Sequence, residues 1–299
     1  MQTSDTATPP EQAPPACDIR RMLQGLERGE FVLYYQPQVS VKTGEVVSAE
    51  ALIRWNHPAR GLIVAGSFLP ALQDASGARR VGEWATWQAR EDIERWRGAG
   101  LKTVPIAVNI HPAHIVKPHF AASFLAASGG LLDIEIVEVP GADEALAPVL
   151  STLRHAGVRV ALDDFGIGYS SFGRLIELPI DILKIDKSFI SALTRPRSEA
   201  RAARQRQVLS SLVSLSHLCA FTTVAEGVET PAAFNAVRAL GFDLSQGYLH
   251  SPAVSADAFR KFLRPATTAQ SHAAVRPLGA ARASLGSPRT AGMLSSEHA

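Results

Sequence analysis

Short apolar segments alternate with helical segments along most of this sequence, and this alternation limits the possible fold more than any other feature. Strands joined through helices run parallel, because each helix returns the chain to the same end of the sheet. The predicted strands are residues 31–36, 45–54, 104–108, 132–137, 157–162, 180–185, 222–225 and 242–244. Eight such strands within about 250 residues predict an α/β fold, a closed TIM-like (β/α)8 barrel.

The first two strands depart from this pattern. Only residues 41–44 separate them, which is too short for a crossover helix, so the first strand should be antiparallel. A helix is predicted where Ala85, Ala89, Ile93 and Trp96 recur at helical spacing. Further helices are predicted within residues 113–127, 143–154, 209–215 and 232–240. The arginine-rich stretch 194–207 is interpreted as a solvated helix face or loop, with a protein contact as the alternative.

Composition argues against several classes of function. The formal net charge is only +2, so no strong overall field attracts a nucleic acid polymer. No apolar run approaches the ~20 residues of a membrane-spanning helix. The N-terminus lacks the basic-then-apolar order of a signal peptide, and a cytoplasmic location is therefore predicted. Cys17 and Cys219 are too few for a disulfide framework or a thiolate metal site.

The two ends of the chain differ from its middle. Residues 1–17 are rich in Pro, Ala, Thr and Gln, and residues 266–299 are rich in Ala, Ser, Arg and Pro. Neither stretch has enough apolar surface to offset the entropy lost on ordering. The predicted organisation is a disordered N-terminal tail (1–17), one folded domain (18–265) and a disordered C-terminal tail (266–299).

Polar side chains gather at the predicted carboxyl ends of the strands, which is the face of a barrel that carries catalytic groups. They are Glu50, Asn109, Glu135, Asp163, Asp164, Lys184, Glu226, Glu229 and Gln246. Adjacent carboxylates such as Asp163 and Asp164 repel by on the order of 4 kcal/mol at 4 Å and an effective dielectric of 20. A solvated loop start would explain that pair alone, but six carboxylates around one mouth call for cations. Oxygen ligands without cysteine favour Mg²⁺ or Mn²⁺ over zinc.

Lys184 has two functional interpretations. Ile180, Ile182 and Lys184 share one strand face, which directs the lysine into the barrel mouth. A Schiff-base lysine needs a depressed pKa. Neighbouring acids raise the pKa of a lysine instead, so this interpretation is the weaker one.

Eight ordered motifs carry a family resemblance. They are Tyr34-Tyr35-Gln36-Pro37, Glu50-Ala51-Leu52 with Arg54-Trp55 after it, Val108-Asn109, Ile134-Glu135-Ile136-Val137-Glu138, Asp163-Asp164-Phe165-Gly166, Leu183-Lys184-Ile185-Asp186, Val224-Ala225-Glu226-Gly227-Val228-Glu229-Thr230 and Gln246-Gly247-Tyr248. With these motifs, residues 18–264 resemble the EAL-domain family of cyclic di-GMP phosphodiesterases. The resemblance implies a barrel with an antiparallel first strand, and hydrolysis of cyclic di-GMP to linear pGpG with two divalent ions, Mg²⁺ or Mn²⁺.

The resemblance also implies a role for each site residue. Metal ligands would be Glu50, Asn109, Glu135, Asp163, Asp164 and Glu226, with Asp163 shared between the two ions. Lys184, Glu226 and Glu50 would be catalytic, with Lys184 orienting the attacking water. Gln36, Arg54 and Gln246 would bind the substrate, and Glu138 and Glu229 would support the loop and the site.

The sequence departs from the family pattern outside the ligand set. Ile167 and Val137 stand where the family usually carries Thr, His111 replaces a common Ser, and Ala65 and Gln73 replace a usual Pro and Glu. These changes put loop order in question, so a weakly active or inactive cyclic di-GMP receptor remains an alternative. A protein-interaction scaffold is a third hypothesis. No cyclase or receiver segment precedes the domain, so we expect regulation through a protein partner, homodimerisation or the tails.

Overall fold

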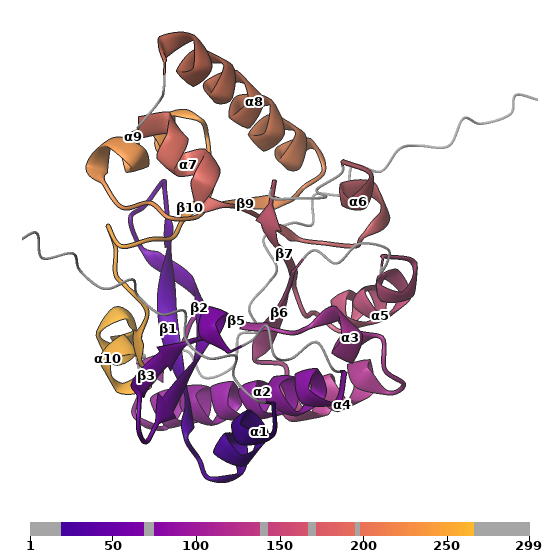
Figure 1. Ribbon diagram of the computed structural model, residues 1–299. Coiled ribbons are helices and arrows are strands. Elements are labelled where there is room, and N and C mark those ends of the chain that lie inside the picture. Colours follow the sequence, from indigo (N-terminus) through magenta and orange to yellow (C-terminus); the bar gives the residue numbers. More distant parts are fainter. Residues whose placement is uncertain (1–18, 69–74, 138–142, 167–171, 195–197, 266–299) are drawn as a thin grey trace, which may run out of the picture. The chain divides into compact units, whose positions relative to one another are not determined.

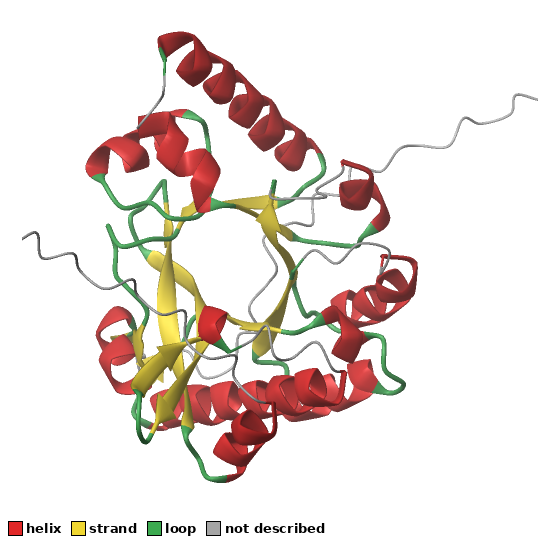
Figure 2. Ribbon diagram, viewed as in Figure 1, coloured by secondary structure: helices red, strands yellow, loops and turns green. Residues whose placement is uncertain are grey.

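The computed structural model describes residues 19–68, 75–137, 143–166, 172–194 and 198–265. Within these residues a ring of strands is surrounded by helices (Figures 1 and 2). Strands β1, β2 and β5 to β10 close the ring, because β1 pairs with both β2 and β10. The predicted barrel is confirmed. The first strand is antiparallel to both of its neighbours in the ring, as its short connection to the second strand requires.

The elements follow one another along the chain in the order expected of a barrel. The strands are β1 (Phe31–Ser40), β2 (Val46–His57), β3 (Gly61–Val64), β4 (Leu101–Lys102), β5 (Ile106–Asn109), β6 (Leu132–Ile136), β7 (Val160–Phe165), β8 (Ile182–Ile185), β9 (Thr222–Ala225), β10 (Leu244–Ser245), β11 (Val254–Ser255) and β12 (Arg264–Pro265). The α-helices are α1 (Ile19–Glu27), α2 (Ala75–Gly98), α3 (Pro112–Ile115), α4 (Phe120–Ser128), α5 (Asp143–His155), α6 (Phe172–Glu177), α7 (Lys187–Thr194), α8 (Glu199–Leu218), α9 (Pro231–Ala239) and α10 (Ala256–Phe259). Short 3₁₀ turns lie at Ala65–Ser67 and Arg260–Phe262.

Several predicted elements have different limits in the structure, and two of them lead to the barrel mouth. The helix expected over 113–127 is divided into α3 and α4. Pro118 lies between them, and His119 adopts a left-handed φ of 65°, so the helical hydrogen bonding cannot continue. The fifth barrel strand begins at Val160 and runs on to Phe165. Asp163 and Asp164 therefore lie within a strand that was expected to end before them.

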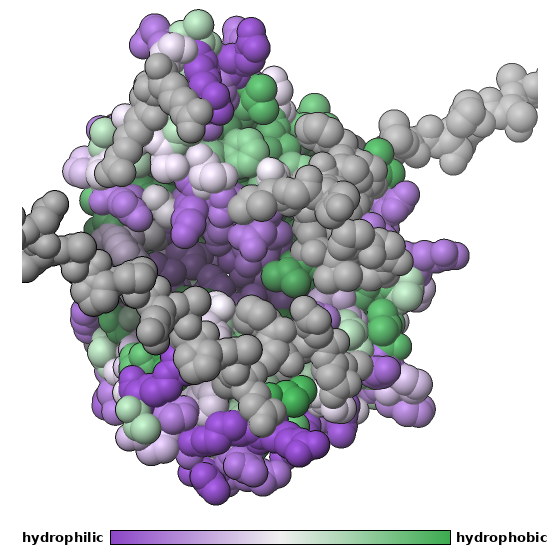
Figure 3. Space-filling view, viewed as in Figure 1, coloured by the Kyte–Doolittle hydropathy of each residue, from purple (hydrophilic) through white to green (hydrophobic). Residues whose placement is uncertain are grey.

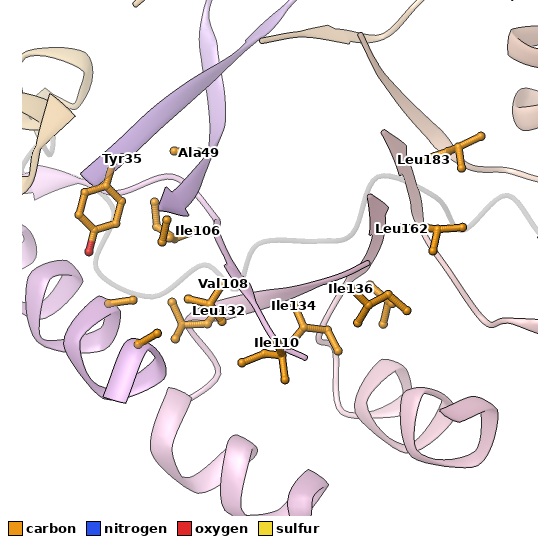
Figure 4. Close-up of a cluster of buried hydrophobic side chains, with 14 of the residues drawn as sticks. Tyr35, Ala49, Ile106, Val108, Ile110, Leu132, Ile134, Ile136, Leu162 and Leu183 are labelled. Atoms are coloured by element: carbon orange, nitrogen blue, oxygen red, sulfur yellow. The ribbon is translucent and has the colours of Figure 1, made fainter. Parts of the chain in front are cut away.

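Apolar side chains on the outer faces of the strands form most of the core. Figure 4 shows residues such as Ile106, Val108 and Ile134 on the helix side of their strands, and all three are fully buried. The helical stripe at Ala85, Ala89, Ile93 and Trp96 is also buried, which confirms the predicted core face of α2. Burial of a large apolar side chain contributes roughly 1.5–3 kcal/mol, so this layer holds the helices against the barrel.

The barrel interior changes from apolar to polar along each strand. A small apolar cluster, made of Ala161, Ile182, Val224 and Leu244, fills part of the interior. Two residues further along the same four strands stand Asp163, Lys184, Glu226 and Gln246. Because side chains alternate between strand faces with a period of two, these polar residues also face the interior, one layer closer to the mouth.

Candidate active site

Lys184 lies at the centre of the polar layer and is only 1% exposed. Its Nζ donates to Glu50 Oε2 at 3.3 Å and forms ion pairs with Asp163 Oδ1 at 2.8 Å and with Glu226 Oε1 at 2.7 Å. It also donates to Glu135. Burial alone would lower the pKa of Lys184, but the four carboxylates outweigh burial and raise this pKa well above its ordinary value. A permanently charged ammonium does not suit Schiff-base chemistry.

Five carboxylates form two clusters around this lysine. Glu50, Glu135 and Asp163 make the first, and Asp163, Asp164 and Glu226 make the second. Within each cluster the ligand atoms lie within 4.8 Å of one another. The clusters share Asp163, so they lie side by side. Two adjacent oxygen-lined positions are the arrangement from which two-metal hydrolases are built.

When no cation is present, bound protons offset part of the repulsion between these carboxylates. Burial, followed by the charge of Glu50, raises the pKa of Glu135 well above its usual range. Burial raises the pKa of Glu226 to about 8 and that of Asp164 to about 6. Burial acts in the same direction on Asp163, but contact with Lys184 outweighs it and lowers the pKa of Asp163. The site therefore favours added positive charge, whether as protons or as cations.

The donor set fits a hard divalent cation. Oε2 of the fully buried Glu135 has no hydrogen-bond partner among the described residues, and such a carboxylate oxygen is costly unless it binds a cation or a proton. The clusters supply carboxylate oxygens only, which are the ligands that Mg²⁺ and Mn²⁺ prefer.

The backbone after Asp163 has unusual geometry. Asp164 is exposed and has a φ of 54°, and Gly166 has a φ of 104°. A Cβ at Gly166 would lie 2.3 Å from Cε2 of Phe189 on α7, so glycine is required there for space as well as for φ. The start of the loop after β7 is thus packed against α7.

Asn109 and His111 follow β5 at the mouth. Asn109 pairs in register with Glu135, and its Nδ2 donates to Glu50 Oε1 at 2.9 Å. This places the amide beside the first carboxylate cluster. His111 precedes α3, where its Nδ1 accepts a hydrogen bond from the Ala113 amide at 3.1 Å. The histidine therefore acts as the N-cap of α3, a role for which Ser, Thr, Asp and Asn are preferred.

Glutamine and serine side chains connect strands β10, β1 and β2. Gln246 Nε2 donates to Glu50 Oε2 at 2.7 Å and to Gln36 Oε1 at 3.0 Å. Its Oε1 accepts from Gln38 Nε2 at 2.9 Å, and Gln38 Oε1 accepts from Ser48 Oγ at 2.6 Å. Gln38 and Ser48 did not emerge from the sequence analysis. The two-residue period of a strand could have predicted them. Gln38 lies two residues after Gln36, and Ser48 lies two residues before Glu50, each on the same strand face.

A cavity of about 270 Å³ opens beside the carboxylates. Figure 3 shows a hollow with hydrophilic residues at the centre of the barrel. Of the predicted site residues, Gln36, Glu50, Glu226, Glu229 and Gln246 line the cavity. Leu52, Lys187 and Tyr248 also line it, and the sequence analysis did not assign them to the site.

Arg54 lies two residues beyond Leu52 on β2 and is not among the residues that line the cavity. Its guanidinium donates to the Ile53 carbonyl at 2.9 Å and lies 5.8 Å from the ring centre of Tyr34. Glu138, Ile167 and Gln73 lie outside the described residues, so the expectations for them remain untested.

The family follows from comparison with known proteins. The model of the EAL domain family matches residues 17–253. This chain belongs to the EAL domain family. The match agrees with the barrel, with its antiparallel first strand and with the ordered motifs.

Among curated relatives, the chain is similar to two proteins of Pseudomonas aeruginosa. It is 35% identical over 258 residues to the bifunctional diguanylate cyclase/cyclic di-GMP phosphodiesterase MucR, a match that covers 83% of this chain and 36% of the relative. It is 33% identical over 253 residues to the cyclic di-GMP phosphodiesterase NbdA, which covers 81% of this chain and 31% of the relative. The EAL chain thus matches about a third of the length of each relative.

Solved EAL structures have the same fold. The structure of the MucR phosphodiesterase in complex with c-di-GMP aligns with a TM-score of 0.71 and 33% identity, covering 81% of this chain and 98% of that one. An EAL domain protein from Listeria monocytogenes aligns with a TM-score of 0.71 and 26% identity, covering 82% and 97%. In the described part of the chain, no helix has the length and apolar character needed to span a membrane.

Proposed function

We propose that this EAL domain hydrolyses cyclic di-GMP to linear pGpG in a reaction that requires divalent cations. The observation that carries this proposal is the pair of carboxylate clusters that share Asp163 around Lys184. The substrate is inferred from the relatives MucR and NbdA, which are named as cyclic di-GMP phosphodiesterases. The whole-protein functions of these longer relatives are not transferred.

The proposed ligand assignment follows the two clusters. Glu50, Asn109, Glu135 and Asp163 would hold one cation, and Asp163, Asp164 and Glu226 would hold the other. When bound, two divalent cations stabilise the negative charge that develops on the attacking and leaving oxygens of an in-line displacement. Mg²⁺ and Mn²⁺ both suit these oxygen ligands.

The protein's own groups position the ligands and accept a proton. Lys184 keeps four carboxylates together through its ammonium. Hydrolysis adds a water oxygen to one phosphorus atom and breaks the bond from that phosphorus to the 3′ oxygen. We assign the Glu226 carboxylate to accept the proton from water, and a proton ends on the 3′ oxygen.

Substrate contacts are proposed at the cavity and beyond it. Gln36 and Gln246 line the cavity, where their amides can meet the dinucleotide. Arg54, on the same face of β2 as Glu50, offers a planar donor fork that suits a phosphate or a guanine edge. Glu229 also lines the cavity and is proposed to support the site from the turn after β9.

The test is a turnover assay on the purified chain. Cyclic di-GMP is incubated with the protein in Mg²⁺, in Mn²⁺ and in EDTA, and the products are separated by chromatography. We expect pGpG in either metal and none in EDTA. Binding without pGpG in any metal would instead establish the receptor, the alternative that the aliphatic residues Ile167 and Val137 favour. Failure to bind or hydrolyse cyclic di-GMP would refute both.

A further inference from the structure

The residues that line the cavity beside the carboxylates include more acidic than basic side chains. Three carboxylates line it, those of Glu50, Glu226 and Glu229. Among the described residues that line the cavity, Lys187 is the one cationic side chain. We propose that Lys187 binds the phosphate of cyclic di-GMP that does not react. This inference rests on the proposed function and adds to it a residue that neither the sequence motifs nor the ligand set includes.

The backbone of Lys187 is fixed at the edge of the cavity. Lys187 is the first residue of α7, and Oδ1 of the preceding Asp186 accepts from the Ser188 amide at 2.7 Å. The turn after β9 packs directly against it, since a Cβ at Gly227 would lie 2.3 Å from Cβ and 3.2 Å from Cα of Lys187. Gly227 has a φ of 64°. The turn that carries Glu226 and Glu229 therefore fixes the position of the Lys187 backbone.

The side chain of Lys187 is available to a ligand. It is exposed, and no hydrogen bond or ion pair joins its ammonium to the rest of the described chain. The other lysine of the site is not available, because Lys184 is 1% exposed and forms ion pairs with four carboxylates. Arg54 does not line the cavity.

The chemistry of the substrate supplies the reason for a second cation. Cyclic di-GMP carries two phosphates, and only the one beside the carboxylate clusters reacts. The other must also pass close to Glu229, a lining carboxylate outside the proposed ligand set, and like charges repel at short range. At about 270 Å³ the cavity is smaller than the ~300–1,000 Å³ typical of sites for drug-sized ligands. A dinucleotide therefore extends over the rim, where the Lys187 ammonium can donate to its second phosphate.

Three variants test the assignment. Lys187→Met removes the charge but keeps the length of the side chain, and Lys187→Arg keeps the charge. Lys42→Met is the matched control. Lys42 is an exposed lysine in the turn between β1 and β2, at the start of β2 and not at its carboxyl end, where the site lies. Each protein is assayed for kcat and KM with cyclic di-GMP in Mg²⁺. Affinity for a phosphorothioate analogue that resists hydrolysis is measured by calorimetry at low and high salt.

Lys187→Met is expected to weaken analogue binding and raise KM by about tenfold, the scale of one charge-assisted hydrogen bond, with a smaller change in kcat. Its affinity should also depend less on salt than that of the parent. Lys187→Arg should restore most of the affinity, and Lys42→Met should match the parent. If the parent binds and Lys187→Met has the same affinity and salt dependence, the inference is wrong and the proposed function stands. If the parent neither binds nor hydrolyses the dinucleotide, both are wrong.

Discussion

Gln246 Nε2 donates to Glu50 Oε2 at 2.7 Å, which ties strand β10 to strand β2 across β1. The orientation of the Gln246 amide is set from the other side, because its Oε1 accepts from Gln38. Gln246 is only 4% exposed. The structure thus gives this glutamine a positioning role toward a metal-ligand candidate, in addition to its place in the cavity lining.

The first prediction concerns Gln38. Gln38→Leu leaves the buried Oε1 of Gln246 and the buried hydroxyl of Ser48 without this partner. We expect a loss of about 1–3 kcal/mol in the free energy of unfolding, measured by urea denaturation, together with weaker metal binding because Glu50 is less well oriented. Gln207→Leu, at an exposed position of α8, is the control. Unchanged stability and metal affinity in Gln38→Leu would show that the hydrogen bonds of Gln38 with Gln246 and Ser48 do not support the site.

The second prediction concerns Glu50. Glu50→Ala removes a carboxylate from the first cluster but leaves Lys184 with Glu135, Asp163 and Glu226 as partners. The barrel should therefore stay folded, as seen by circular dichroism. Turnover should fall by at least about 100-fold, since even partners outside the ligand shell of a metal cost 10–100-fold. A folded variant with the activity and metal dependence of the parent would contradict the assignment of Glu50.

The third prediction links pH to stabilisation by cations. The pKa of Glu226 rises from 4.5 to about 8 and that of Asp164 from 3.8 to about 6 in the metal-free protein. A carboxyl whose pKa is raised by folding contributes stability at low pH, and this contribution is lost as the pH rises through the folded value. Metal-free protein should therefore lose stability between about pH 4 and pH 8.

Cations that replace these protons should stabilise the protein most where the protons have left. The increase in Tm caused by Mg²⁺ should be larger at pH 9 than at pH 6, measured by scanning calorimetry against EDTA-treated protein. In Glu226→Gln the metal-free protein should lose less stability between pH 6 and pH 9. An increase in Tm that is equal at both pH values would rule out titration of these carboxyls as the cause.

The fourth prediction separates two reasons for glycine at position 166. Gly166→Ala places alanine at a φ of 104° and puts a Cβ 2.3 Å from the Phe189 ring. Gly157→Ala places alanine at a similar φ, +92°, with no atom within 4 Å of the new Cβ. Gly157→Ala should cost about 1–2 kcal/mol of stability, and Gly166→Ala clearly more.

Adding Phe189→Ala to Gly166→Ala should recover the difference between the two alanine variants. Such recovery is a coupling energy of the kind that neighbouring residues show. Equal stability losses in Gly166→Ala and Gly157→Ala would mean that Phe189 moves aside without cost.

The sequence by itself determined the barrel and the chemistry of its mouth. Strand and helix periods alternate along the chain, and each period specifies which residues share a face before any long-range contact forms. That is why Lys184, Glu226 and Gln246 could be predicted to face the barrel interior. The short segment 41–44 likewise specified the antiparallel first strand.

Only the tertiary structure decided how these residues meet. The bond between Gln246 and Glu50 spans 196 positions, and the bond between Gln38 and Gln246 spans 208. Such pairs depend on strand register around the closed ring, which no local period specifies. The same holds for Lys187, whose place at the cavity comes from the turn at Gly227 packing against α7. Periodicity fixes the face a residue occupies, but closure of the barrel fixes its neighbours.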